Sequence, residues 1–361
     1  MRYAMRLSAL ALALAGCGDG SSITDTLPKG NVLFAHAPID LSGVEIHQPM
    51  GEPNVLPRDH GGFGLLSPYA FPPSVPVIAL AGGVIVTAQR GTRVVPEFAP
   101  EPVRGRSYDD WGLFVQVSST MRANYGHVTA LHPTLMAALG GQPADETGHN
   151  VSVPIAAGDT IGWVGPHPAM DFSITDFTLN LSFLNPSRYP DEHIYRGNIF
   201  DYFSEPVRTQ MLALASRDIP PFGGKHDYDV EGRIVGNWFL EGTTSTIQWS
   251  RQLAIVYDHL KGNRVFISDG SPMRDVPGFE GPGAPDIWWV VGNAPRPETV
   301  GVAEGIVQYK LISPAHVADE LKTVQGVMLV QMIESGRIRV EIFKGVTEAE
   351  GFTAAAKVYV R

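Results

Sequence analysis

Three side chains in the first half of the chain have the chemistry to bind a divalent metal or to move protons: His60, His127 and Asp171. Imidazole and carboxylate groups are common zinc ligands, and a neutral imidazole also accepts and donates protons. Asp171 lies between Met170 and Phe172, where a carboxylate is costly unless it is paired, binds a metal or points to solvent. Each histidine also has an ordinary interpretation, since His60 precedes two glycines in a loop-like run and His127 can be a hydrogen-bonded core residue.

Cys17 is the only cysteine in 361 residues and follows a segment typical of export. Arg2 and Arg6 precede a short apolar run, residues 7–15, that is well below the roughly 20 residues needed to span a bilayer. Exported proteins usually pair their cysteines in disulfides, so a single cysteine calls for another role. Residues 14–17 (LAGC) resemble the lipobox of bacterial lipoproteins, which implies a signal peptide over 1–16 and lipidation of Cys17. An ordinary secretory signal with a chance cysteine is the alternative.

The residues after Cys17 suggest where the anchored protein resides. Gly18 follows the cysteine directly, and lipoproteins that lack an aspartate there tend to reach the outer membrane. Residues 17–45 are expected to form the lipidated start and a flexible tether, because residues 18–22 are small and polar. We therefore expect a location in the cell envelope, lipid-anchored to the outer membrane and facing the periplasm, with the membrane as one partner.

Composition and motif content exclude several classes of function. The formal net charge is −10 with 27 Lys and Arg residues and no basic cluster, which argues against nucleic acid as a partner. The chain contains no Gly-x-Ser-x-Gly elbow, His-Glu-x-x-His motif or phosphate-binding loop. Because the single cysteine is assigned to lipid attachment, thiol catalysis is also excluded.

The elements that must position these residues are mostly strands. Short runs rich in Val, Ile, Phe and Tyr alternate with turn residues, among 39 Gly and 29 Pro. We predict a first β-rich unit over 46–218, with strands in 75–88, 111–118, 124–131 and 153–164, two short strands in 170–183 and a helix in 200–216. Residues 219–224 are the expected boundary, and a second β-rich unit follows over 225–361.

The second unit is predicted to be a small barrel or sandwich, because it has eight strand candidates in about 137 residues. These candidates lie in 229–241, 252–258, 264–268, 287–291, 306–311, 324–333, 337–343 and 356–360. Gly236-Asn237-Trp238 resembles the Gly-x-Trp of lipocalin-like barrels, which suggests a carrier of a small ligand. A core tryptophan after a turn glycine is the simpler interpretation of the same three residues.

The first unit carries a series of features in a characteristic order. Along the chain they are Asp59-His60, PVIALAGGVI (76–85), YGHV (125–128), IAAGDTIGWVG (155–165) and MDFS (170–173). This series resembles the lysostaphin-type zinc endopeptidases, which cleave peptidoglycan and have the duplicated hybrid motif fold. The resemblance covers about residues 55–185 and implies a mostly β, duplicated-hybrid-motif-like barrel or sandwich followed by the second β domain.

The resemblance assigns roles residue by residue. His60 matches the first zinc ligand and His127 matches a histidine that shuttles protons or stabilises the oxyanion. The family's aspartate ligand is replaced by Gly64, and its His-x-His pair falls on Ala169 and Asp171. Zinc is thus a possible cofactor only with a rebuilt ligand set of His60, Asp171 and His127, to which Asp59 or His167 can contribute.

These departures favour a function other than hydrolysis. We expect an exported lipoprotein with a degenerate endopeptidase-like domain that binds peptidoglycan or an envelope protein without catalysis. One alternative is an active zinc-dependent peptidoglycan hydrolase with the rearranged ligands. The other is a small-ligand carrier that uses the C-terminal barrel.

Overall fold

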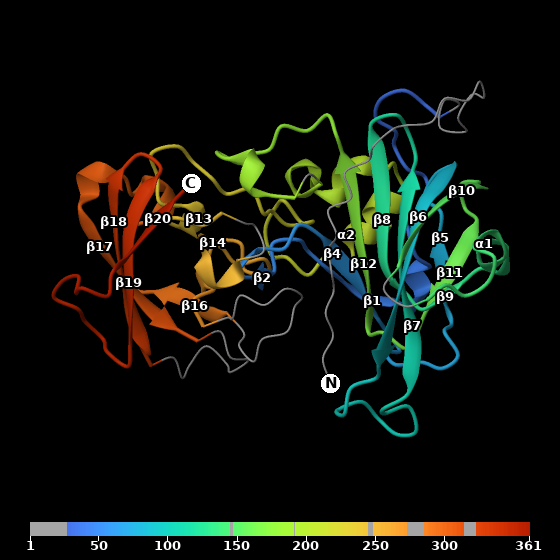
Figure 1. Cartoon of the computed structure of the whole chain (residues 1–361), viewed down its shortest axis with the longest axis horizontal. Helices are drawn as coiled ribbons and strands as arrows, with labels where there is room; N and C mark the ends of the chain where they lie inside the picture. Colours follow the sequence, from blue (N-terminus) through green and yellow to red (C-terminus); the bar gives the residue numbers. More distant parts are fainter. Residues whose placement is uncertain (1–26, 145–146, 191, 245–247, 273–284, 314–322) are drawn as a thin grey trace.

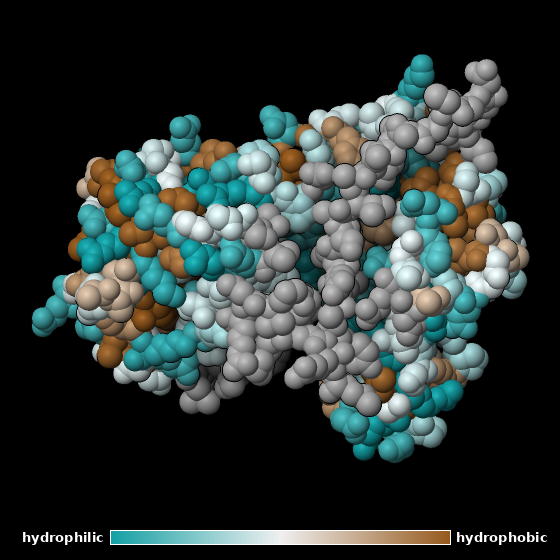
Figure 2. All heavy atoms as spheres, viewed as in Figure 1, coloured by the Kyte–Doolittle hydropathy of each residue, from teal (hydrophilic) through white to brown (hydrophobic). Residues whose placement is uncertain are grey.

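The computed structural model describes residues 27–144, 147–190, 192–244, 248–272, 285–313 and 323–361. The expected signal peptide and Cys17 lie outside these residues. The described chain forms two β-rich units that lie side by side, as Figure 1 shows. On the visible face, hydrophilic side chains gather at the lower end of the first unit, and apolar ones are scattered in small groups (Figure 2). No described helix has the length and apolar character needed to cross a membrane.

A seven-stranded antiparallel sheet forms the centre of the first unit, in the order β1-β4-β12-β8-β7-β6-β10. Burial alternates along most of β7, as in a strand that faces a core on one side, whereas β4 and β12 carry runs of consecutive buried residues. The prediction that the chain is mostly β is confirmed. The strands of this sheet are β1 (Val44–Gln48), β4 (Gly61–Leu65), β6 (Gly83–Val94), β7 (Ser107–Gln116), β8 (Met121–Val128), β10 (Gly148–Ile155) and β12 (Ala169–Asp176).

A smaller three-stranded sheet shares the core of the large one. Its strands are β5 (Val75–Ile78), β11 (Thr160–Val164) and β9 (Ala130–Leu131), in that order. Val77 and Ile161 of this sheet belong to the same buried cluster as Phe63, Trp111 and Phe172 of the large sheet. The first unit also contains the short β2 (Pro53–Asn54) and β3 (Leu56–Pro57), the helices α1 (Pro133–Ala138) and α2 (Val207–Leu212), and the 3₁₀ helices η2 (Leu41–Gly43), η3 (Pro186–Arg188), η4 (His193–Tyr195) and η5 (Ile199–Tyr202).

Three sequence-based expectations for the first unit need correction. The flexible tether expected over 17–45 does not extend through its described part, because Phe34 and Ile39 are buried in the core and the Phe34 amide donates to the Tyr202 carbonyl. The two short strands expected in 170–183 are the single strand β12. The helix expected over 200–216 is confined to η5 and α2, because Pro206 lacks the N–H that a continuous helix would need.

The second unit is a closed eight-stranded antiparallel barrel in which each strand pairs with the next and β20 closes on β13. Of the two predicted architectures, barrel and sandwich, the unit has the barrel. Its interior is packed with side chains such as Trp238, Ile255, Tyr309 and Met328, which are fully buried. The strands are β13 (Gly236–Leu240), β14 (Gln252–Tyr257), β15 (Val265–Asp269), β16 (Asp286–Val291), β17 (Ile306–Ile312), β18 (Gly326–Glu334), β19 (Arg337–Lys344) and β20 (Lys357–Val360), with η6 (Trp249–Arg251), η7 (Pro297–Thr299) and η8 (Val302–Glu304) between them.

The barrel contacts the segment that leads into β4. Val55, at the turn between β2 and β3, is fully buried although its φ is 68°. A Cγ methyl group of Val55 packs against Gly270 of the barrel, where an added Cβ would lie only 2.8 Å from it. Leu56 packs with buried aromatic residues of both units. Because Asp59 and His60 follow directly, the barrel helps to fix the backbone that carries them.

Candidate functional site

Five neighbouring elements of the large sheet each place one ionisable side chain in a single row. Arg93 is on β6, Asp110 on β7, His127 on β8 and Asp171 on β12, while His60 immediately precedes β4. These strands are consecutive in the sheet, so the five side chains lie next to one another although they are spread over more than 100 positions of the sequence. The row therefore crosses most of the sheet at right angles to the strands.

The centre of the row is a carboxylate shared by two imidazoles. The distance from His60 Nε2 to Asp171 Oδ2 is 3.3 Å, and that from His127 Nε2 to the same oxygen is 3.1 Å. Since β4 and β8 flank β12, the two rings reach Asp171 from its two sides. The structure thus brings together the three residues that the sequence singled out.

The second nitrogen of each ring is bound to another carboxylate. His60 Nδ1 lies 2.8 Å from Asp59 Oδ1, and His127 Nδ1 lies 2.9 Å from Asp110 Oδ1. The other oxygen of Asp110 accepts a hydrogen bond from Arg93 Nε. Both rings are therefore held between two carboxylates.

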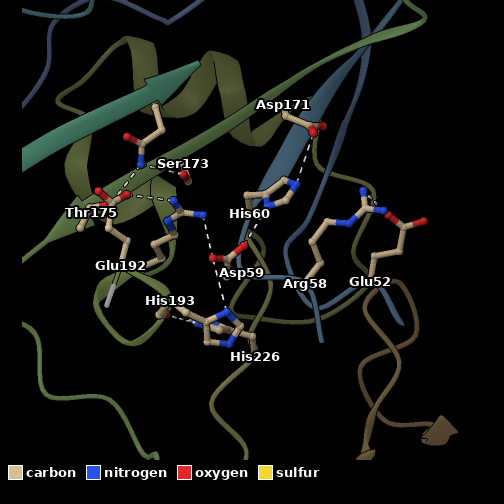
Figure 3. A network of polar contacts seen from close by, with 12 residues as sticks. Glu52, Arg58, Asp59, His60, Asp171, Ser173, Thr175, Glu192, His193 and His226 are labelled. Atoms are coloured by element: carbon tan, nitrogen blue, oxygen red, sulfur yellow. Dashed lines mark hydrogen bonds and ion pairs between the residues drawn. The ribbon is translucent and has the colours of Figure 1, made fainter. Parts of the chain in front are cut away.

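The row continues beyond Asp59 toward Glu192 and His193, as Figure 3 shows. Asp59 Oδ2 accepts a hydrogen bond from Arg196 at 2.7 Å and lies 3.4 Å from His193 Nδ1. Arg196 also pairs with Glu192 at 3.1 Å, and Glu192 binds Arg122 at 2.5 Å. From end to end, nine side chains of alternating charge are linked: Arg122, Glu192, Arg196, Asp59, His60, Asp171, His127, Asp110 and Arg93.

Two glycines make room for the rings over Asp171. Gly62 on β4 and Gly126 on β8 lie directly opposite Asp171 in the sheet. A Cβ at Gly126 would lie 3.0 Å from the Asp171 Cβ, and one at Gly62 would lie 3.3 Å from its Oδ1. Because neither neighbour has a side chain, His60 and His127 can extend to the carboxylate.

The charges around each imidazole outweigh the effect of its burial. Burial alone would lower the pKa of His60, but Asp171 and Asp59 raise it from 6.5 to about 9. Burial would also lower the pKa of His127, but the charges of Asp171 and Asp110 raise it to about 9. The pKa of Asp171 stays well below its usual value, because the two rings outweigh the burial that would raise it. At neutral pH this part of the row is an imidazolium–carboxylate–imidazolium triad.

His127 is held in an uncommon conformation. Its φ is 61°, in the left-handed region that few non-glycine residues adopt. Its ring stacks on that of His167 with 3.8 Å between centroids. Burial and the neighbouring charge of His127 lower the pKa of His167 to about 4, so His167 is neutral. His167 thus packs against the triad without joining the charged row.

Other members of the row were not identified from the sequence. Asp110, Arg93, Arg196 and Glu192 have no motif around them, and only the strand order places them beside the two histidines. One signal was available, since Asp110 is a carboxylate inside a predominantly apolar strand, as Asp171 is. His193 was not singled out either; it lies in η4 with only 13% of its side chain exposed and contacts Asp59.

The side chains present do not fit the zinc site that the resemblance implies. Gly64 and Ala169 are directly opposite each other on the face that carries Asp171, and neither offers a donor atom. The ring nitrogens of His60 and His127 are all bound to carboxylates, and an imidazolium has no lone pair for a metal. Among the described residues, no three His, Cys, Asp or Glu side chains form a group that could hold a metal ion.

Comparison with known proteins gives a limited likeness. No family model matches the chain, and no curated protein matches it. It is similar to two solved M23, or lysostaphin-type, structures. One is a mutant of the catalytic domain of the prophage-encoded M23 protein EnpA from Enterococcus faecalis, with 12% identity and a TM-score of 0.21, covering 40% of this chain and 86% of that one. The other is the M23 metalloprotease pseudoalterin from the deep sea, with 14% identity and a TM-score of 0.24, covering 48% of this chain and 88% of that one. At such scores the likeness assigns no role to any residue, so function must be argued from the side chains.

Proposed function

We propose that the first unit is a peptidoglycan-endopeptidase-like domain that binds a cell-wall peptide or an envelope protein without cleaving it. One observation carries this proposal: both ring nitrogens of His60 and of His127 are bound to carboxylates. A general base needs a free lone pair, and a zinc ligand needs a neutral nitrogen directed at the metal. Neither requirement is met while the triad holds its protons.

The triad remains accessible enough to contact a partner. The side chains of His60 and Asp171 are 27% and 29% exposed, and that of Arg93 is 39% exposed. The exposed part of the row thus offers carboxylate lone pairs of Asp171 and, at its end, the guanidinium of Arg93. An extended peptide has the complementary alternation of carbonyl and amide groups, and it can carry charged groups of either sign.

An active zinc hydrolase is the second candidate, and one observation favours it. His60 Nε2 and His127 Nε2 lie 3.3 and 3.1 Å from the same oxygen of Asp171, so three side chains with ligand chemistry are neighbours, although they are not arranged around a metal. Hydrolysis would require both rings to lose a proton and Asp171 to move from between them.

Zinc content and peptidoglycan cleavage separate these candidates. We expect the purified chain to contain well under one zinc per molecule, to sediment with insoluble peptidoglycan and to release no soluble fragments. His60→Ala should reduce sedimentation, whereas Glu45→Gln, an exposed change on β1, should not. If the wild type held about one zinc per chain, lost that zinc in His60→Ala and released soluble fragments, the non-catalytic proposal would be wrong and hydrolysis would take its place.

We also propose that the protein is lipid-anchored through Cys17 in the envelope, on the outer membrane facing the periplasm. The basic start, the short apolar run and the unpaired cysteine support this. Labelled palmitate should be incorporated into the wild-type protein and not into Cys17→Ser, and the variant should leave the membrane fraction. Equal membrane association of both would rule the anchor out.

A further inference from the structure

A cavity of about 250 Å³ opens at one end of the C-terminal barrel. Its lining combines apolar and charged side chains of β14, β15, β16, β19 and β20. Six of the lining residues combine apolar surface with charged or hydroxyl groups: Leu253, Asp269, Asp286, Lys344, Lys357 and Tyr359.

The strand register shows that the charged groups point toward the barrel axis. Leu253 belongs to the interior cluster and lies opposite Asp269, which in turn lies opposite Asp286. Directly opposed residues in an antiparallel pair share a face of the sheet. On the other side, Lys357 lies opposite Val340, which is also an interior residue. Carboxylates of β15 and β16 therefore face lysines of β19 and β20 across the barrel end.

One pair of these charges is already joined. Lys344 Nζ and Asp286 Oδ2 form an ion pair. Since β17 and β18 separate β16 from β19, this pair reaches across the end of the barrel rather than along its wall. It supplies one side of the cavity and confirms the inward direction of both residues.

Asp269 and Lys357 can each accept a further polar partner. Asp269 accepts hydrogen bonds from the Ser271 amide and hydroxyl, one on each oxygen, which leaves a lone pair on both. Lys357 makes no ion pair within the described part of the chain. Tyr359 is 3% exposed and lines the cavity.

We propose that this cavity binds a small zwitterion with an aliphatic group, of the size of a free amino acid. Asp269 would hold its ammonium group, Lys357 its carboxylate, and the Tyr359 hydroxyl would donate to it. The aliphatic group would pack on Leu253. The cavity lies below the roughly 300 Å³ at which pockets for drug-sized ligands begin, which suits so small a molecule.

The test uses the full chain, leucine as the probe and calorimetric titration at millimolar concentration. Leucine should bind, and Asp269→Asn and Lys357→Gln should each weaken binding about tenfold, the effect of one lost charged hydrogen bond. Leucine methyl ester, which lacks the carboxylate, should be insensitive to Lys357→Gln. N-acetylleucine, which lacks the ammonium group, should be insensitive to Asp269→Asn.

Two further variants serve as controls. Tyr359→Phe removes only the hydroxyl and should weaken binding without disturbing the barrel, as checked by near-ultraviolet circular dichroism. Lys261→Gln, on the exposed turn at the other end of the barrel, should bind as the wild type does. The proposal would be overturned if the wild type did not bind leucine, or if Asp269→Asn and Lys357→Gln bound leucine as tightly as the wild type. Because the first unit takes no part, either outcome is independent of peptidoglycan binding.

Discussion

Replacing Asp171 by asparagine tests the central feature of the site. The amide has the size of the carboxylate but carries no charge, so the rings of His60 and His127 lose their shared partner. Their outer carboxylates, Asp59 and Asp110, remain in place. We expect lower stability at neutral pH and a lower pKa for both rings.

The size of the effect follows from the pKa of each ring. A rise from 6.5 to about 9 corresponds, at about 1.4 kcal/mol per pKa unit, to ~3.4 kcal/mol for each imidazole. Two carboxylates face each ring, so Asp171 accounts for about half of this. Over both rings, Asp171→Asn should lower the free energy of unfolding by about 3 kcal/mol, within the range known for breaking a buried ion pair.

Urea unfolding at pH 6 and pH 10 measures this change together with its sign. Because the pKa of each ring is higher in the folded than in the unfolded protein, its protonation stabilises the folded state. This stabilisation is complete below pH 6.5, the pKa in the unfolded protein, and is lost as the pH rises through 9. The difference between wild type and Asp171→Asn should therefore be large at pH 6 and much smaller at pH 10. In parallel, nuclear magnetic resonance of the histidine rings should show His60 and His127 titrating near 9 in the wild type only.

Glu45→Gln is the control, because it also neutralises a carboxylate of the large sheet but on the exposed side of β1. It should change stability little at either pH. A loss below about 0.5 kcal/mol in Asp171→Asn at pH 6 would refute the ion-pair account. So would a difference that grows between pH 6 and pH 10.

Three further changes probe the surroundings. His47 is buried without hydrogen bonds, and burial lowers its pKa to about 3. The free energy of unfolding of the wild type should therefore fall by about 1.4 kcal/mol per pH unit below pH 6.5. His47→Leu should abolish that slope in urea unfolding. Gly126→Ala would place a methyl group 3.0 Å from the Asp171 Cβ, and it should lower the melting temperature and the pKa of the neighbouring rings. Arg361 donates to several backbone carbonyls and stacks over a buried tryptophan of the barrel, so Arg361→Met should cost about 3 kcal/mol in barrel unfolding.

Each of these has a result that would contradict it. An unchanged acid slope in His47→Leu would mean that other groups control acid unfolding. Gly112→Ala is the matched control for Gly126→Ala, because a Cβ there meets nothing within 4 Å, and equal effects of the two would dismiss the steric argument. A wild-type melting curve for Arg361→Met would show that its hydrogen bonds are replaced by water at no cost.

Local patterns in the sequence were enough to identify most strands and their class. Alternating or continuous apolar runs bounded by Gly and Pro predicted the eight strands of the barrel, because side chains repeat every two residues along a strand. The same patterns failed in 17–45 and 200–216. Burial of Phe34 and Ile39 depends on a surface formed by distant residues, and the helix was shortened by the backbone requirement at Pro206.

For the site, residue types alone selected His60, His127 and Asp171 as the groups with chemistry to offer. They did not reveal whether the three meet, which nitrogens are occupied, or that Asp110 and Arg93 join them. Those facts depend on the order β4-β12-β8-β7-β6, a set of long-range pairings that no local pattern encodes. The sheet brings opposite charges into contact where little water separates them, and their mutual pairing decides the protonation state of the imidazoles.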